Sequence, residues 1–266
     1  MRAPGASAEV VLQSLRAVAN LSSNTAENQT ALGVAGACQA VVEAMRAPGA
    51  SAEVVLQALR AVVNLSANNA DNKTALGEAG ACQAVVEAMR APGASAEVVL
   101  QALRAVVNLS ANNADNKTAL GVAGACQTVV DAMRAPRASA EVVLQALWAV
   151  ANVSSSTAEN QTALGVAGAC QAVVDAMRAP GASAEVVLQS LRAVANLSSN
   201  TAENQTALGV AGACQAVVEA MRAPGASAEV VLQALRAVVN LSANNADNKT
   251  ALGVAGACQT VVDAMR

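Results

Sequence analysis

Residues 147–154 read Leu-Trp-Ala-Val-Ala-Asn-Val-Ser, and the same frame occurs five more times with Arg in place of Trp, for example at 59–66. Internal repetition at a fixed period indicates a repeat protein, in which each unit packs against its neighbours. The asparagine of the frame recurs every 44 residues, at Asn20, Asn64, Asn108, Asn152, Asn196 and Asn240.

The whole chain follows this period. Units of 44 residues begin with Met-Arg-Ala-Pro at residues 1, 45, 89, 133, 177 and 221, and Met-Arg closes the chain at 265–266. Residues 1–44 are identical to 177–220, and 89–132 are identical to 221–264. Copies this similar imply recent duplication, gene conversion or deliberate engineering. We expect a single domain, 1–266, built from these six units.

Each unit predicts three helices, as the copy at 69–110 shows. A short helix over 69–76 begins at an Asn/Asp cap and is expected to end at Gly77 and Gly80. A second helix over 81–90 stops before Pro92. Ser95 caps a third helix, in which apolar residues at helical spacing form one buried face. No alternation of period two is sustained, which argues against strands.

These residues resemble the armadillo repeat of importin-α and β-catenin. The resemblance rests on the Asn-Ala-Asp-Asn-Lys opening at 69–73, the Ala-Gly-Ala at 79–81 and the Ala-Leu-Arg-Ala-Val-Val-Asn-Leu closing at 102–109. It covers the whole chain and implies an all-α fold, a right-handed armadillo-type α-solenoid superhelix with three helices per 44-residue repeat. A HEAT array, the alternative, normally has two helices per repeat and lacks the closing Asn.

The two ends of the array are unusual within this frame. Met1 and Arg2 are interpreted as the tail of a second helix, followed by a third helix over 7–22, and the chain closes on a second helix over 258–266. Neither truncated repeat carries the polar cap that solenoids usually need. A structural module, engineered or natural, that associates head to tail without a dedicated ligand is therefore one candidate function.

The asparagine row predicts the leading candidate function, peptide binding. In the family that the sequence resembles, this Asn faces the concave groove and holds the backbone of an extended peptide. The residue type fits that role, because an amide side chain offers both donors and an acceptor. The alternative is that each Asn only bonds the backbone of a neighbouring repeat. The expected partner is an extended peptide or a disordered segment of another protein.

The residue four positions before each Asn lies on the same helical face. Importin-α-like repeats commonly have Trp here, in slots for basic side chains, whereas this chain has Trp only once. A row of arginines favours an acidic or phosphorylated partner over a basic one, as in β-catenin. The alternative is that the arginines pair with acids of neighbouring repeats, such as Glu53 or Glu87. The row is Arg16, Arg60, Arg104, Trp148, Arg192 and Arg236.

Two further rows have one residue per repeat. Six glutamines from Gln13 to Gln233, seven positions before each Asn, extend the same stripe and are expected to be solvated or, as the alternative, to make secondary contacts in the groove. Six cysteines from Cys38 to Cys258, at the start of each second helix, are expected to be buried thiols. No histidine and no clustered carboxylates accompany them, so no metal site is predicted.

Composition limits the function further. A net charge of −3 does not indicate a nucleic-acid binder. There is no signal pattern and no apolar run of membrane-spanning length, so a cytoplasmic or nuclear rather than secreted protein is expected, with no membrane partner. Without a His base, a phosphate loop or another catalytic constellation, we predict neither enzymatic activity nor a cofactor.

Overall fold

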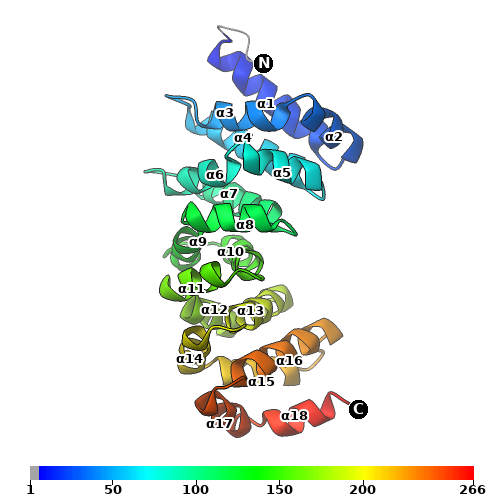
Figure 1. Cartoon of the computed structure of the whole chain (residues 1–266), viewed down its shortest axis with the longest axis vertical. Coiled ribbons are helices and arrows are strands. Elements are labelled where there is room, and N and C mark those ends of the chain that lie inside the picture. The colour runs from blue at the N-terminus through cyan, green and yellow to red at the C-terminus, as the bar shows by residue number, and fades with distance from the viewer. Residues whose placement is uncertain (1–5) are drawn as a thin grey trace. The chain divides into compact units, whose positions relative to one another are not determined.

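The computed structural model describes residues 6–266, and all of its regular elements are α-helices, three in each repeat (Figure 1). The first helices are short: α2 (Ala26–Val34), α5 (Ala70–Glu78), α8 (Ala114–Val122), α11 (Ala158–Val166), α14 (Ala202–Val210) and α17 (Ala246–Val254). The second helices are α3 (Ala37–Met45), α6 (Ala81–Arg90), α9 (Ala125–Arg134), α12 (Ala169–Arg178), α15 (Ala213–Arg222) and α18 (Ala257–Asp263). The third and longest helices are α1 (Ala8–Ser22), α4 (Ala52–Ser66), α7 (Ala96–Ser110), α10 (Ala140–Ser154), α13 (Ala184–Leu197) and α16 (Ala228–Ser242).

The chain divides into two compact units, residues 1–128 and 129–266, whose boundary falls within α9. Inside each unit the third helices pack side by side, α1 on α4 on α7 in the first and α10 on α13 on α16 in the second. A second helix packs on the third helix that follows it, as α3 does on α4 and α12 on α13. Small side chains permit this close packing, and the largest fully buried residues are leucines such as Leu59 and Leu191. The predicted all-α solenoid with three helices per repeat is therefore confirmed, whereas the single domain stays a prediction.

The caps that the sequence predicts define the helix ends. The Ser51 hydroxyl accepts a hydrogen bond from the N–H of Val54 at 3.3 Å and so caps α4. Gly80 separates α5 from α6 with a φ of 87°, a left-handed conformation that glycine adopts without steric cost. The structure differs from the prediction at Gly77, which lies inside α5 instead of ending it, and at α18, which ends at Asp263 rather than at residue 266.

The turn before each third helix normally uses glycine, and repeat four is the exception. Gly49 has a φ of 73°, as the third position of a type II turn requires. Arg137 stands at the equivalent position and is not among the residues with positive φ. The turn nevertheless keeps its closing hydrogen bond, from the N–H of Ala138 to the carbonyl of Ala135 at 2.9 Å. The change to arginine is therefore accommodated by a different turn geometry. The predicted helical tail at Met1 and Arg2 lies outside the described residues.

Candidate functional site

In each unit, the predicted asparagines lie on the surface formed by that unit's third helices, which we call the third-helix face. Asn64, Asn108, Asn196 and Asn240 each donate to a carbonyl in the last turn of the preceding third helix. Asn64 Nδ2 lies 2.8 Å from the Ala19 oxygen, and Asn196 Nδ2 lies 2.8 Å from the Ala151 oxygen. Asn108 and Asn240 make the same bond, at 3.0 and 2.8 Å. Each of these four carbonyls also accepts from the hydroxyl of the serine three residues later, as the Ala19 oxygen does from Ser22 Oγ at 3.3 Å, so the asparagine adds a contact between repeats to a helix end that is already partly satisfied.

This contact corresponds to the alternative in which Asn bonds a neighbouring repeat, yet it uses only part of the amide. An Asn side chain has two N–H groups and a carbonyl oxygen. In Asn64, Asn108 and Asn196 the bond to the neighbouring helix uses one N–H, and the side chains are half-buried rather than enclosed. The contact therefore fixes the orientation of the amide and leaves a donor and an acceptor toward the face.

The arginine row is held by a second set of contacts between repeats. Arg16 pairs with Glu53 and Arg60 with Glu97, while Arg192 Nη2 lies 2.9 Å from Glu229 Oε1. The alternative that the arginines pair with acids of neighbouring repeats is therefore observed for Glu53. Glu87 instead lies 3.9 Å from Arg46, which is outside the row.

The pairing changes the electrostatics of the face. A salt bridge from Arg192 and a hydrogen bond from Gln233 lower the pKa of the Glu229 carboxyl. Because Arg16, Arg60 and Arg192 are each paired with a glutamate, arginine and glutamate alternate along the face. The face therefore carries less net positive charge than the arginine row alone indicates. Arg236 differs from Arg16, Arg60 and Arg192, because it is exposed and no salt bridge to it is found within residues 6–266.

Trp148 interrupts this alternation. It is half-buried, and the guanidinium carbon of Arg192 lies 5.5 Å from its ring centroid, within range of a cation–π contact. Glu185 stands where the partner of an arginine at 148 would be. Its carboxylate accepts a hydrogen bond from Gln189 Nε2 at 2.8 Å and has no salt bridge among the described residues.

The third-helix face of the second unit is hollowed into a groove of about 420 Å³. Asn152 and Asn196 line it together with Arg192 and Arg236, so it joins members of both predicted rows. Glu229 and Gln233 complete its polar wall. The rows therefore meet at one surface on α10, α13 and α16, and in size the groove matches the lower end of ligand-binding clefts.

The glutamine row is less solvated than expected. Gln57, Gln189 and Gln233 are buried, so the prediction of mainly solvated side chains is wrong for them. Each of the last two donates to the glutamate four residues earlier, at 2.8 and 2.9 Å, which accounts for their position against the helix. Only Gln13 is fully exposed.

The cysteine row is buried in five of its six members, and Cys258 is exposed. Desolvation raises the pKa of these thiols, to about 11 for Cys38 and about 12 for Cys82. Cys38 Sγ lies 3.9 Å from the carbonyl oxygen of Asn72 in the next repeat. No group of side chains suited to a metal ion occurs in the part of the chain that the structure describes. None of the described helices is both long and apolar enough to cross a bilayer.

A further asparagine row, in the first helices, was not predicted as a site and makes buried contacts between repeats. Asn72 and Asn116 are 3% exposed. Asn116 Nδ2 donates to the Leu109 oxygen at 3.1 Å, in its own repeat, and to the Lys73 oxygen at 3.0 Å, in the preceding one. A glycine at the same place in every first helix is the sequence signal for it, because the Asn116 amide occupies the space beside Gly77.

Three observations define the class of the protein: three helices per repeat, side-by-side third helices, and polar ladders that join consecutive repeats. Together they describe an α-solenoid repeat protein. Neither a protein-family model nor a curated protein matches the sequence.

Solved structures do match it. A designed armadillo repeat protein in complex with the peptide (KR)4 is 30% identical, with 88% of this chain and 94% of that chain covered and a TM-score of 0.74. A second designed armadillo repeat protein is 30% identical over 90% and 96% of the two chains, with a TM-score of 0.78. Computationally designed armadillo repeat proteins for modular peptide recognition are 30% identical over 87% and 93%, with a TM-score of 0.75. The chain belongs to the armadillo repeat family.

Proposed function

We propose that the chain is a non-enzymatic peptide-binding scaffold that holds an extended segment of another protein along its third-helix face. The observation that carries the proposal is the groove in which Asn152 and Asn196 lie beside Arg192 and Arg236. The similar designed proteins support it, since one is in complex with (KR)4 and others are for modular peptide recognition.

The asparagines supply the backbone contacts in this proposal. An extended peptide that leaves water must have its N–H and carbonyl groups satisfied. The free N–H and carbonyl of a half-buried Asn196 match those two groups, and its bond to the Ala151 oxygen keeps the amide from rotating. Third helices pack at about 8–10 Å and an extended chain rises about 3.3 Å per residue, so one Asn serves two or three peptide residues.

The arginine row gives the proposal its charge preference, for acidic over basic partners. Arg192 is already paired with Glu229, so an acidic ligand gains little there without displacing the glutamate. Arg236 lines the same groove and is exposed, which makes it the cation most available to a carboxylate or phosphate. We therefore expect a modest preference, located at Arg236 and weakened by salt.

Fluorescence polarisation with labelled extended peptides of acidic, neutral and basic sequence tests both parts. The double substitution Asn152→Ala, Asn196→Ala is expected to weaken the binding of every peptide by about 0.5–1.5 kcal/mol per lost hydrogen bond. Circular dichroism is expected to show unchanged helicity. Arg236→Gln is expected to weaken the binding of acidic peptides and to leave the binding of neutral and basic peptides unchanged. Arg178→Gln is the matched control, because it removes the same charge from α12, which does not line the groove.

Each outcome addresses one part of the proposal. Unchanged affinity in the double asparagine variant removes the ladder from peptide binding. Tighter binding of a Lys/Arg-rich peptide than of an acidic one reverses the charge preference and leaves the scaffold function standing.

A second candidate function, a structural module that associates end to end, is favoured by one observation. An apolar groove of about 280 Å³ lies open between α1 and α3.

A further inference from the structure

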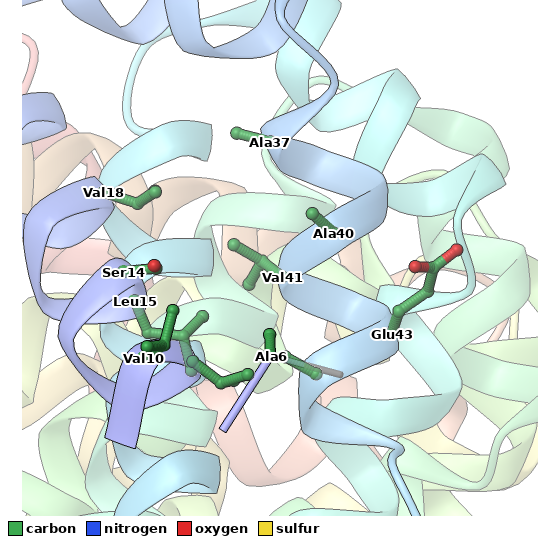
Figure 2. Close-up of a pocket in the computed structure, with 11 residues that line it drawn as sticks. Ala6, Val10, Ser14, Leu15, Val18, Ala37, Ala40, Val41 and Glu43 are labelled. Carbon is green, nitrogen blue, oxygen red and sulfur yellow. The ribbon is translucent and has the colours of Figure 1, made fainter. Parts of the chain in front are cut away.

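The open groove lies between α1 and α3. Figure 2 shows Val10, Leu15 and Val18 of α1 directed toward Ala40 and Val41 of α3 across it. The aligned surface one repeat later is covered by α1 and α3 themselves, which pack on α4. Val10 is 55% exposed, whereas Val54 at the aligned position is 7% exposed. The internal junction therefore shows what covers such a surface: the second and third helices of a preceding repeat.

A matching surface lies at α16 and α18. Val262 of α18 is 43% exposed, while Val86 and Val218 at the aligned positions are fully buried. Those two valines lie in α6 and α15, which pack on the third helices α7 and α16. α18 therefore presents a surface on which the third helix of another repeat fits.

From these two surfaces we infer that a second copy of this chain docks its α1, α2 and α3 onto α16, α17 and α18 of the first. This deepens the second candidate function and does not depend on peptide binding. The register is fixed, because the contact repeats those already present between consecutive repeats. An interface that joins two different faces is heterologous, so each added copy presents a free face for the next.

Charge complementarity supports this register. Within the chain, an arginine of one third helix pairs with a glutamate 37 positions later, as Arg192 does with Glu229. Arg236 and Glu9 have no salt bridge among the described residues, and neither does Glu185, whose aligned partner is Trp148; Glu9 is engaged there only by Gln13, at 2.7 Å. In the docked register Glu9 of the second copy meets Arg236 of the first. An exposed pair adds little affinity, but it selects this register over others.

An asparagine and a glycine give a second, independent match. At internal junctions the amide of Asn72 or Asn248 occupies the space beside a first-helix glycine, Gly33 or Gly209, where a Cβ would lie 1.9 Å from the amide oxygen. Gly253 holds the same position in α17, and nothing lies within 4 Å of its Cβ position. In the docked register Asn28 of the second copy fills this space. The space beside Gly253 is then the position at which Asn28 of the second copy binds.

A substitution at Gly253 tests the proposal and leaves the fold intact. Sedimentation velocity and light scattering of the 266-residue chain, from about 1 µM to 1 mM, measure association; the expected weight-average mass rises with concentration. Gly253→Ala is expected to weaken association at least tenfold without lowering the melting temperature, because the added methyl meets only the incoming Asn28. Val254→Ala is the matched control: Val254 is 86% exposed and its equivalent Val210, at a junction inside the second unit, is 85% exposed, so the junction does not cover this side chain.

A complementation experiment tests the direction of docking. Val10→Glu alters the other face, at a side chain already more than half exposed. Each variant alone is expected to be monomeric, because Gly253→Ala alters the docking surface at α17 and Val10→Glu alters the docking surface at α1. An equimolar mixture retains one intact pair of faces and is expected to stop at two copies.

The possible failures are distinguishable. A wild-type chain that stays monomeric at 1 mM overturns association itself. Association that both Gly253→Ala and Val10→Glu leave unchanged shows that copies meet elsewhere, and overturns this interface alone. Peptide binding is measured separately at about 1 µM, where association is negligible, so neither result bears on the groove.

Discussion

Replacing one first-helix glycine by alanine is expected to have opposite effects at two aligned positions. Gly77 and Gly253 both lie near the end of a first helix, where alanine is normally favoured over glycine by about 0.5–1 kcal/mol. At Gly253 nothing lies within 4 Å of an added Cβ, so Gly253→Ala is expected to stabilise the dilute chain by that amount. At Gly77 the same methyl lies 1.9 Å from the Asn116 Oδ1 and 3.0 Å from its Cγ.

The cost at Gly77 follows from what holds Asn116. Its side chain is 3% exposed and donates to two carbonyls, those of Leu109 and Lys73, at 3.1 and 3.0 Å. The amide cannot retreat without breaking these bonds, and an unsatisfied buried polar group costs about 1–3 kcal/mol. Loss of both hydrogen bonds, corrected for the gain in helix propensity, is expected to destabilise the folded chain by roughly 1–5 kcal/mol in Gly77→Ala.

Urea unfolding followed by circular dichroism at 222 nm measures the free energy of unfolding of both variants. A double-mutant cycle with Asn116 shows whether the steric contact causes the destabilisation. In an Asn116→Ala background the clash is absent, so Gly77→Ala is expected to be neutral or stabilising there, with a coupling energy above about 1 kcal/mol. If Gly77→Ala costs as much with Asn116 removed as with it present, the steric reasoning is refuted.

Four further predictions rest on the burial of particular side chains. Ser190 is fully buried and its hydroxyl has no hydrogen-bond partner, so Ser190→Ala is expected to raise the free energy of unfolding by about 1–3 kcal/mol; a lower urea midpoint would contradict this. A thiol reagent at pH 8 is expected to modify Cys258 quickly and the five buried cysteines slowly, and modification of several thiols at one fast rate would refute their burial. Because burial raises the pKa of Cys82 from 9.0 to about 12, its thiol ionises first in the unfolded chain, and the melting temperature is expected to fall as pH rises above 9.0. Trp148 is half-buried beside Arg192, so acrylamide is expected to quench its fluorescence and a peptide in the groove to change it; blue-shifted, unquenchable emission in the free chain would contradict this placement.

The sequence predicts the features that depend on one repeat. Helix type, the Ser51 cap and the glycine at residue 80 are local, and all three are found as expected. The boundary at Gly77 was predicted wrongly for a physical reason: a helix-breaking residue is present because a neighbour needs the space, not because the helix ends. Sequence spacing within one repeat does not reveal that neighbour.

The sequence indicates which residues share a face of the helix but not which residues they contact. Helical spacing predicts that Asn196 and Arg192 share one face, and both line the groove, whereas their role in peptide binding stays a prediction. The partners of these residues lie 45 and 37 positions away, in the adjacent repeats. Which residue they meet depends on the offset between packed third helices, and the repeat period alone does not determine that offset. Pairing of the arginines with acids of neighbouring repeats is therefore an alternative that the sequence leaves open, and Arg192 with Glu229 is one such pair in the structure.

Identical repeats make this dependence on neighbours directly visible. Residues 1–44 and 177–220 have the same sequence, so Ser14 and Ser190 are the same residue in two settings. Ser14 is exposed beside the open groove, where a hydroxyl is solvated, whereas Ser190 is enclosed with its hydroxyl unsatisfied. The serine suits an open face and is unfavourable at a covered one. Local sequence fixes the helices of each repeat, and the energetic value of a side chain is then set by whether another repeat covers it.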